Sequence, residues 1–219
     1  MSLNEEYDSK DREYYRQVRT EILDKIPLGT KRMLEIGCAE GVMAQVAKGK
    51  FGMDEVVGVE YNEQSASVAS NRLDKVICGN VETIELPFPE NYFDVIICGD
   101  VLEHLIDPWE TLKKLVIHLR IGGVVIVSIP NIAYWDVVRS IMRDEFTYQD
   151  SGILDRTHLR FFTRSTIIAL LHHAGLEVIN EHRNTDVHRG QLWWRILTFG
   201  YHKNADVVQF VFTAQKKIA

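Results

Sequence analysis

The residues with the clearest chemical potential surround a short turn between positions 33 and 42. An apolar run there leads into three small residues at alternate positions, Gly37, Ala39 and Gly41. Small residues let the backbone turn sharply and approach a bound ligand closely. A second apolar run ends in Glu60, whose carboxylate could accept hydrogen bonds from both hydroxyls of a ribose. Strand, turn and terminal acid together indicate a nucleotide site, whereas a solvated strand end is the simpler alternative for Glu60.

Glu35, two residues before the turn, indicates which nucleotide fits. A dinucleotide site prefers the spacing Gly-x-Gly-x-x-Gly, because its helix start faces a pyrophosphate. Counted from Gly37, the corresponding positions hold Ala39 and Val42, so this pattern is not met. A carboxylate beside the turn would repel a pyrophosphate but attract an ammonium group, such as that of the methionine tail of S-adenosylmethionine. The charge of Glu35 therefore favours this methyl donor over NAD.

Several motifs of the chain resemble those of class I S-adenosylmethionine-dependent methyltransferases, in particular the small-molecule branch that includes ubiquinone-biosynthesis-type O-methyltransferases. The family's first motif is an acid followed by alternate glycines; Glu35 and the turn match it, with Ala39 as the departure. Glu60 matches the ribose-binding acid. The resemblance covers residues 30 to about 180, and three further matches are the adenine-contacting segment at 79–82, the fourth strand with its turn at 93–104, and the approach to the fifth strand at 119–123.

The resemblance implies S-adenosylmethionine as the cofactor and S-adenosylhomocysteine as the product formed from it. It also implies which positions contact the cofactor, with Asn80 standing where many members carry Asp. These predicted cofactor-binding residues are Glu35, Gly37, Cys38, Ala39, Gly41, Glu60, Tyr61, Asn80, Val81, Gly99, Asp100, Val101 and Tyr15. Tyr14, Tyr15 and Arg19 belong to an expected lid over the cofactor, and core packing is the alternative for the two tyrosines.

In-line displacement of the sulfonium methyl group is the chemistry that the resemblance implies, and the protein then mainly aligns the partners and excludes water. A general base is needed only where the acceptor is protonated. The segment 155–163 resembles one that lies over the acceptor pocket of glycan-pathway methyltransferases. The predicted catalytic residues come from this segment and from the ends of the fourth and fifth strands: His104, Asn131, His158 and Arg160. An Arg there suits a phosphate or carboxylate on the acceptor.

Three of these four residues also have structural alternatives. His104 could pack at a helix start or contact the cofactor alone. Asn131 could cap the helix that follows it. Arg160 could form an ion pair with Asp150 or Asp155 instead of meeting an acceptor.

Alternating short apolar runs and amphipathic stretches predict the elements that position these residues. Such alternation is typical of βαβ units and a largely parallel sheet. We expect an α/β fold with a single doubly wound sheet of seven mostly parallel strands, helices on both faces and an antiparallel last strand. The expected strands lie near 31–36, 55–60, 75–78, 93–99, 123–129, 176–181 and 206–214.

Capping residues mark several helix starts. Asn62, Asp107 and Thr163 precede amphipathic stretches and are expected as N-caps. A further helix is expected from about residue 9 to 25, and an irregular stretch from 143 to 162.

One methyltransferase domain is expected over residues 1–219. Within it, we expect a helical lid at 1–29, a cofactor-binding core at 30–142, and an acceptor-side insert with the final strands at 143–219.

Composition and charge narrow the partners. Hydrophobic residues make up 46% and charged residues 26% of the chain, and no apolar run is long enough to span a bilayer. The formal net charge of −6 argues against nucleic acid and leaves a small-molecule acceptor, anionic or glycan-related.

Cys38, Cys78 and Cys98 are expected as buried, reduced thiols of a cytoplasmic protein. No metal is expected, because no set of clustered carboxylates is recognised. Trp193-Trp194 could mediate a homodimer contact, although covering a sheet edge is preferred.

Rival functions remain open at this stage. A NAD-dependent reductase or epimerase would need the better phosphate turn and usually a Tyr-x-x-x-Lys pair, which the sequence lacks. A nucleic-acid methyltransferase would normally carry an Asn/Asp-Pro-Pro-aromatic motif where residues 99–102 stand. A catalytically inactive cofactor-binding partner module also fits the cofactor motifs, and turnover to S-adenosylhomocysteine would separate it from an enzyme. Oxygen is the first choice of acceptor atom, followed by nitrogen and carbon.

Overall fold

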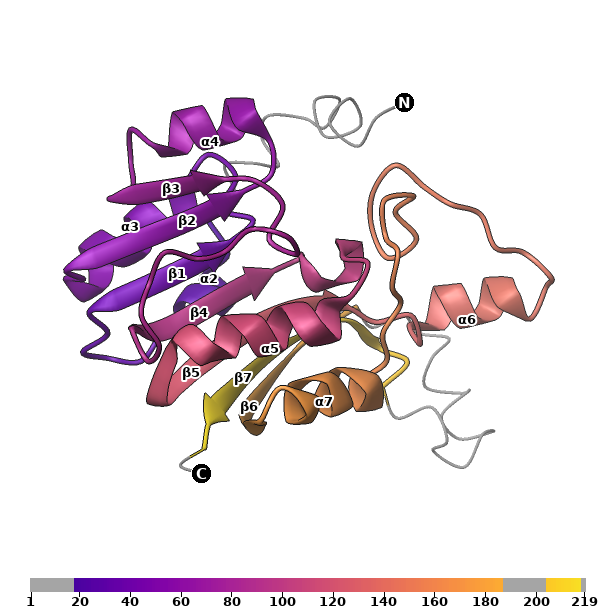
Figure 1. Cartoon of the computed structure of the whole chain (residues 1–219). Coiled ribbons are helices and arrows are strands. Elements are labelled where there is room, and N and C mark those ends of the chain that lie inside the picture. Colours follow the sequence, from indigo (N-terminus) through magenta and orange to yellow (C-terminus); the bar gives the residue numbers. More distant parts are fainter. Residues whose placement is uncertain (1–17, 187–203, 218–219) are drawn as a thin grey trace.

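The computed structural model describes residues 18–186 and 204–217, which contain one seven-stranded sheet with flanking helices (Figure 1). The strands are β1 (Arg32–Ile36), β2 (Glu55–Glu60), β3 (Lys75–Cys78), β4 (Phe93–Gly99), β5 (Leu119–Pro130), β6 (Leu176–Thr185) and β7 (Val207–Lys216). The helices are α2 (Thr20–Leu23), α3 (Val42–Phe51), α4 (Glu63–Ala69), the 3-10 turn η2 (Leu102–His104), α5 (Pro108–His118), α6 (Trp135–Ile141) and α7 (Arg164–His173).

Strand order makes the sheet doubly wound. The strands lie in the order β3-β2-β1-β4-β5-β7-β6. The pairs from β3 to β5 are parallel, whereas β7 runs antiparallel to both of its neighbours. The chain reverses its direction of winding between β1 and β4, and ligands of open α/β sheets bind at the carboxyl ends of the strands at such a switch point. The predicted fold, including the antiparallel last strand, is confirmed.

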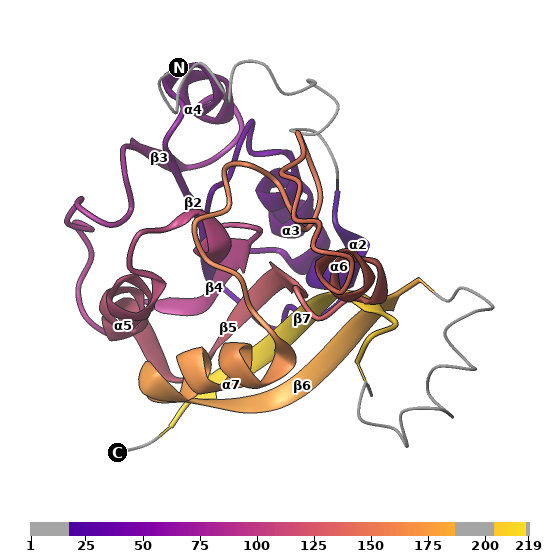
Figure 2. The ribbon, with the colours of Figure 1, turned by 90° about the vertical axis from the view of Figure 1, so that its right-hand side faces the viewer.

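Helices cover both faces of the sheet because side chains alternate along each buried strand. Leu34 and Ile96 belong to a cluster that also holds Leu112 of α5 and Leu170 of α7. Met33 faces the opposite cluster, together with Ile22 of α2 and Met43 of α3. Figure 2 shows α5 and α7 on one side of the sheet and α2 and α3 on the other. Burying each large apolar side chain stabilises the fold by roughly 1.5–3 kcal/mol, so the two clusters hold the strand ends rigidly in place.

The three predicted N-caps are confirmed. Asn62 Oδ1 accepts a hydrogen bond from the Ser65 amide at 2.8 Å and begins α4. Asp107 accepts from the Glu110 amide at 3.1 Å, directly before Pro108 in the first turn of α5. Thr163 forms a capping box with Thr166 at the start of α7. These side chains satisfy amides that the first helical turn leaves without partners.

Several boundaries differ from those expected. β5 begins at Leu119 rather than near 123, because Leu119 pairs with Phe93 across an irregularity in the ladder. β6 extends to Thr185, and β7 extends to Lys216. The expected helix at 9–25 is described only as α2, which ends at Leu23.

Two expectations concern the less regular parts of the chain. The stretch 143–162 is irregular as expected, with only isolated bridges. Trp193-Trp194, Tyr14 and Tyr15 lie outside the described residues. Among the helices that the structure describes, none combines the length and apolar character needed to cross a bilayer.

Candidate functional site

A cavity of about 580 Å³ opens at the carboxyl ends of β1, β2 and β4. Its wall contains most of the predicted cofactor-binding residues: Glu35, Gly37, Cys38, Ala39, Glu60, Tyr61, Asn80, Val81, Gly99, Asp100 and Val101. Gly41 lies behind the wall, where a side chain would meet Ala69 and Leu73. Of the three small residues of the turn, Gly37 and Ala39 therefore line the cavity and Gly41 does not.

The turn between β1 and α3 requires left-handed backbone angles at all three small residues. The φ angles are +68° at Gly37, +48° at Ala39 and +76° at Gly41. A Cβ atom at Gly37 would stand 2.7 Å from a methyl group of Val101, so only glycine fits there. Ala39 adopts the same region at a steric cost of about 1–2 kcal/mol. Ala39 thus keeps the backbone conformation of the turn, at the cost of local backbone strain.

Glu60 is held at the end of β2 by two backbone amides. Its carboxylate accepts hydrogen bonds from Ala39 N and Asn62 N, each at 2.8 Å. Burial raises the pKa of Glu60, and these hydrogen bonds act in the opposite direction. An ionised carboxylate offers about four lone-pair positions, so two amides leave room for ribose hydroxyls.

Glu35 is a buried acid in the cavity wall. Its side chain is 6% exposed, and Oε2 has no hydrogen-bond partner in the described part of the chain. Burial, together with the nearby charge of Glu60, raises the pKa of Glu35 to about 8. A cationic group entering the cavity would stabilise the ionised form, which fits the ammonium group of S-adenosylmethionine.

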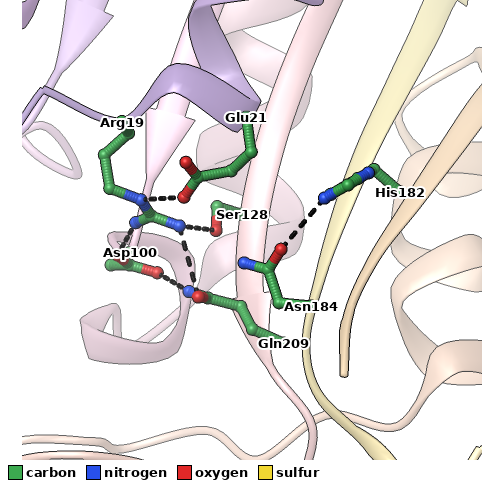
Figure 3. Close-up of polar contacts among 7 residues, drawn as sticks. All are labelled: Arg19, Glu21, Asp100, Ser128, His182, Asn184 and Gln209. Atoms are coloured by element: carbon green, nitrogen blue, oxygen red, sulfur yellow. Dashed lines mark hydrogen bonds and ion pairs between the residues drawn. The ribbon is translucent and has the colours of Figure 1, made fainter. Parts of the chain in front are cut away.

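Arg19, Asp100 and Gln209, which all line the cavity, belong to one network of polar contacts (Figure 3). Arg19 extends from just before α2 and contacts the Asp100 carboxylate, and it also donates to Ser128 Oγ at 2.8 Å. Gln209 of β7 donates to Asp100 and accepts from Arg19 at 3.2 Å. Burial alone would lower the pKa of Arg19. The negative charges and hydrogen bonds of Asp100 and Glu21 together outweigh this effect, so the pKa is raised above its ordinary value. Sequence reasoning named Arg19 but missed Gln209 and Ser128, because nothing in the local pattern links β7 to β4.

The segment after β3, which is predicted to contact the adenine, is held in place by its own asparagine. Asn80 Oδ1 accepts a hydrogen bond from the Glu82 amide at 2.9 Å, which holds Val81 at the cavity wall. Cys78, just before it, is exposed, so the expectation that it is buried is wrong. β3 is an edge strand of the sheet, and its end therefore remains open to solvent. The other two thiols, Cys38 and Cys98, are buried as expected, and all three are free.

The structure brings two of the predicted catalytic residues together. His104 lines the cavity, and its ring lies 4.7 Å from the ring of His158, centroid to centroid. Nδ1 of His104 lies 3.2 Å from Thr157 O, and Nδ1 of His158 lies 3.0 Å from Ile153 O. His158 itself is buried and is not part of the wall.

The other two predicted catalytic residues do not line the cavity. Asn131 is fully buried and donates to Asn204 O at 3.0 Å and to Val207 O at 2.8 Å, so it fixes the start of β7. Arg160 is exposed and donates to Ile106 O at 3.1 and 2.5 Å.

The structural alternatives for these two residues were a helix cap for Asn131 and an ion pair with Asp150 or Asp155 for Arg160. The structure shows neither within the described residues. Asn131 Oδ1 accepts from Ala133 N at 3.1 Å, but α6 begins only at Trp135. Within the described residues, Asp150 pairs with Arg156 rather than with Arg160.

Sequence reasoning also missed Glu103, which lies on η2 directly before His104. Its side chain is 1% exposed, and neither carboxylate oxygen has a hydrogen-bond partner within the described residues. Burial, and then the charge of Asp100, raises the pKa of Glu103 well above its ordinary value. The available signal was a Glu placed directly after the apolar pair Val101-Leu102, where a solvated acid is unexpected.

Comparison with known proteins places these features in context. The chain matches the model of a family described as a methyltransferase domain over residues 7–181. A protein of Mycolicibacterium smegmatis named "probable S-adenosylmethionine-dependent methyltransferase" is 31% identical over 150 residues, which cover 67% of this chain and 52% of that protein. A ubiquinone biosynthesis O-methyltransferase of Bradyrhizobium diazoefficiens is 30% identical over 110 residues, which cover 48% of this chain and 42% of that protein. The chain thus spans about half the length of these curated relatives.

Solved structures show the same fold. A crystal structure of an S-adenosylmethionine-dependent methyltransferase from Archaeoglobus fulgidus has a TM-score of 0.63 to this chain at 19% identity. The match covers 98% of both chains. At this identity the likeness concerns the fold alone.

Proposed function

This chain belongs to the methyltransferase-domain family, and we propose that it transfers a methyl group from S-adenosylmethionine to a small-molecule acceptor. The family, its cofactor and the Rossmann-like fold expected from the motifs are confirmed. The acceptor, the acceptor atom and the roles of individual residues belong to the proposal.

The observation that carries the proposal is the pair of buried carboxylates on either side of the glycine turn. Glu35 and Glu60 both line the cavity, and Glu35 has an oxygen without a hydrogen-bond partner among the described residues. Glu60 would hold the ribose hydroxyls, and Glu35 would attract the ammonium group of the methionine part. Asn80 and Val81 would meet the adenine. A pyrophosphate would face two buried acids here, which disfavours a dinucleotide.

The proposed acceptor atom is oxygen, and its supporting observation is the place of His104. When bound, S-adenosylmethionine supplies an electrophilic methyl group, and the carbon–sulfur bond electrons remain on sulfur in the product S-adenosylhomocysteine. His104 lines the cavity and lies where it could take the proton of an acceptor hydroxyl. The relative from Bradyrhizobium diazoefficiens is named as an O-methyltransferase, which agrees with this choice.

An anionic or glycan-related acceptor is the finer part of the proposal. Leu159, from the segment that resembles the acceptor cover of glycan-pathway enzymes, contributes to the cavity wall. The amides of Leu159 and Arg160 donate to Glu103 O at 2.8 and 2.9 Å, so this segment is anchored at the cavity. The exposed guanidinium of Arg160 would meet a phosphate or carboxylate of an acceptor that extends beyond the cavity.

The test combines calorimetric titration with S-adenosylhomocysteine and turnover of S-adenosylmethionine across a panel of phenol, sugar and carboxylate acceptors. Glu60→Ala should weaken cofactor binding by about 1–3 kcal/mol, because buried ribose hydroxyls lose a charged partner. His158→Ala should keep the cofactor affinity and lower turnover. Unchanged affinity in Glu60→Ala would remove Glu60 from the site. Tight binding without turnover on every acceptor would instead identify an inactive binding module.

A further inference from the structure

Three side chains that can bind metal converge beside the cavity. Glu103 and His104 come from η2, and His158 comes from the irregular stretch before α7. One potential ligand atom from each residue lies within 4.8 Å of the other two. A single ion with bonds of about 2.0–2.2 Å could join all three after small side-chain rotations.

Glu103 supplies an independent reason to expect a cation there. The side chain is 1% exposed, and both carboxylate oxygens lack hydrogen-bond partners among the described residues. An ionised carboxylate in such a place is costly unless it is paired or coordinates a metal. The guanidinium of Arg19 is hydrogen-bonded to Asp100, Glu21, Ser128 and Gln209, and it forms no hydrogen bond with Glu103 within the described residues.

The backbone contacts of the two histidines select the tautomer that a metal requires. In both residues Nδ1 lies within hydrogen-bond distance of a carbonyl oxygen, Thr157 O for His104 and Ile153 O for His158. A carbonyl can only accept, so Nδ1 carries the proton and the lone pair of the neutral ring lies on Nε2. Metal-ligating histidines usually donate their other N–H to a carbonyl or carboxylate in this way.

From this geometry we infer that Glu103, His104 and His158 form a binding site for one divalent transition-metal ion beside the methyl-transfer cavity. Two imidazoles and one carboxylate suit Zn²⁺, Mn²⁺ or Fe²⁺ better than Mg²⁺ or Ca²⁺, which prefer oxygen ligands. Three protein ligands leave coordination positions for an oxygen of the acceptor. With the ion bound, His104 would be a ligand and no longer a base, so an acceptor hydroxyl on the ion would release its proton to water, and the oxygen would be directed toward the methyl donor. This last role rests on the proposed function, whereas metal binding does not.

No metal was expected from the sequence because it shows no cluster of carboxylates. The three residues of this site include only one carboxylate, that of Glu103. The third residue, His158, also follows the first two by more than fifty positions. Only the path of the stretch before α7 brings His158 against His104.

The experiment uses the untagged full chain, dialysed against a chelator and then titrated with Zn²⁺ by calorimetry and with Co²⁺ by visible absorption. We expect one ion per chain, with Co²⁺ bands typical of mixed nitrogen and oxygen ligation and much weaker binding of Mg²⁺. Glu103→Gln and His158→Ala should each weaken Zn²⁺ binding at least about 10- to 100-fold, because even the loss of a residue that only hydrogen-bonds to a metal ligand weakens binding by that much. His172→Ala, which changes an exposed histidine on α7, should bind like the unaltered chain.

Affinity for S-adenosylhomocysteine, measured on every variant, shows that the cavity is still folded. Stoichiometric binding that survives in Glu103→Gln and His158→Ala would place the ion elsewhere and overturn the inference, as would no binding to the unaltered chain. Methyl transfer by an unaltered chain that binds no metal would refute the metal site and leave the proposed function standing. Metal binding without transfer to any acceptor would do the reverse.

Discussion

At the scale of single residues, Glu35 is the unusual acid of the cavity wall. It lies on β1 with its carboxylate buried and only partly hydrogen-bonded, close to the charge of Glu60. The site thus holds an acid whose ionised form is disfavoured until a cation arrives. This arrangement favours a ligand with an ammonium group over one with a phosphate.

The first prediction concerns proton release from Glu35. The pKa of about 8 means that the empty site holds this proton at pH 7, and a bound ammonium group would lower the pKa and release it. Affinity for S-adenosylhomocysteine should therefore rise as the pH increases from 6 toward 8. Calorimetry at pH 7 in two buffers of different ionisation enthalpy measures the released proton. Glu35→Gln should bind more weakly and release fewer protons, and equal release by the variant would contradict this role.

The second prediction concerns the strained alanine of the turn. Ala39 has a φ of +48°, a region that costs a non-glycine residue about 1–2 kcal/mol. Ala39→Gly removes this strain but gives the unfolded chain more freedom, worth about 0.5–1 kcal/mol. The variant should therefore be more stable by about 0.5–1 kcal/mol in urea unfolding. Ala44→Gly, inside α3, should lose at least about 1 kcal/mol, and a similar loss at both positions would show that the turn is not strained.

At the scale of elements, the segment before α2 is joined to the sheet by one guanidinium. Arg19 contacts Asp100 after β4, Ser128 on β5 and Gln209 on β7 (Figure 3). These three elements are neighbours in the sheet although they are far apart in the sequence. The network therefore joins Arg19, near the N-terminal end of the described chain, to β7, the last strand in the sequence.

The third prediction tests this junction with a double-mutant cycle. Arg19→Ala should destabilise the chain by about 1–3 kcal/mol, because the half-buried Asp100 loses its charged partner. Adding Asp100→Asn should recover part of the loss, with a coupling energy above about 0.5 kcal/mol. Lys50→Ala, which breaks the exposed pair with Asp24, should change stability by less than about 0.5 kcal/mol. Strictly additive losses in urea unfolding would show that the contact carries no energy.

At the scale of the whole molecule, the cavity lies between the two halves of the doubly wound sheet. Its wall combines residues from the ends of β1, β2 and β4 with Arg19 and with Gln209 of β7. A ligand that contacts all of these elements favours the folded state in which they meet, and binding should therefore stabilise the described domain as a unit.

The fourth prediction measures this linkage by thermal unfolding. S-adenosylhomocysteine at about 100 times its Kd adds about 2.7 kcal/mol. Since each kcal/mol shifts the Tm by about 2–4 °C for a chain of this size, the midpoint should rise by about 5–10 °C. NAD at the same concentration should leave the Tm unchanged. A larger shift of the Tm with NAD would indicate a dinucleotide site instead of a site for S-adenosylmethionine.

The sequence by itself determined those features that depend on neighbours along the chain. Apolar periodicity located the strands, capping chemistry located the starts of α4, α5 and α7, and the small residues with Glu35 and Glu60 marked the cofactor side. Each of these signals is local, because a period, a cap or a turn involves only a few consecutive residues.

Only the tertiary structure decided which distant side chains meet. It joined Gln209 to Asp100, placed His158 against His104, and directed Asn131 to the start of β7 instead of the cavity. These contacts follow from the strand order and from the path of an irregular stretch, which no local periodicity records. The proposed acceptor side of the site therefore depends on the fold, while the motifs of the proposed cofactor side are already visible in the chain.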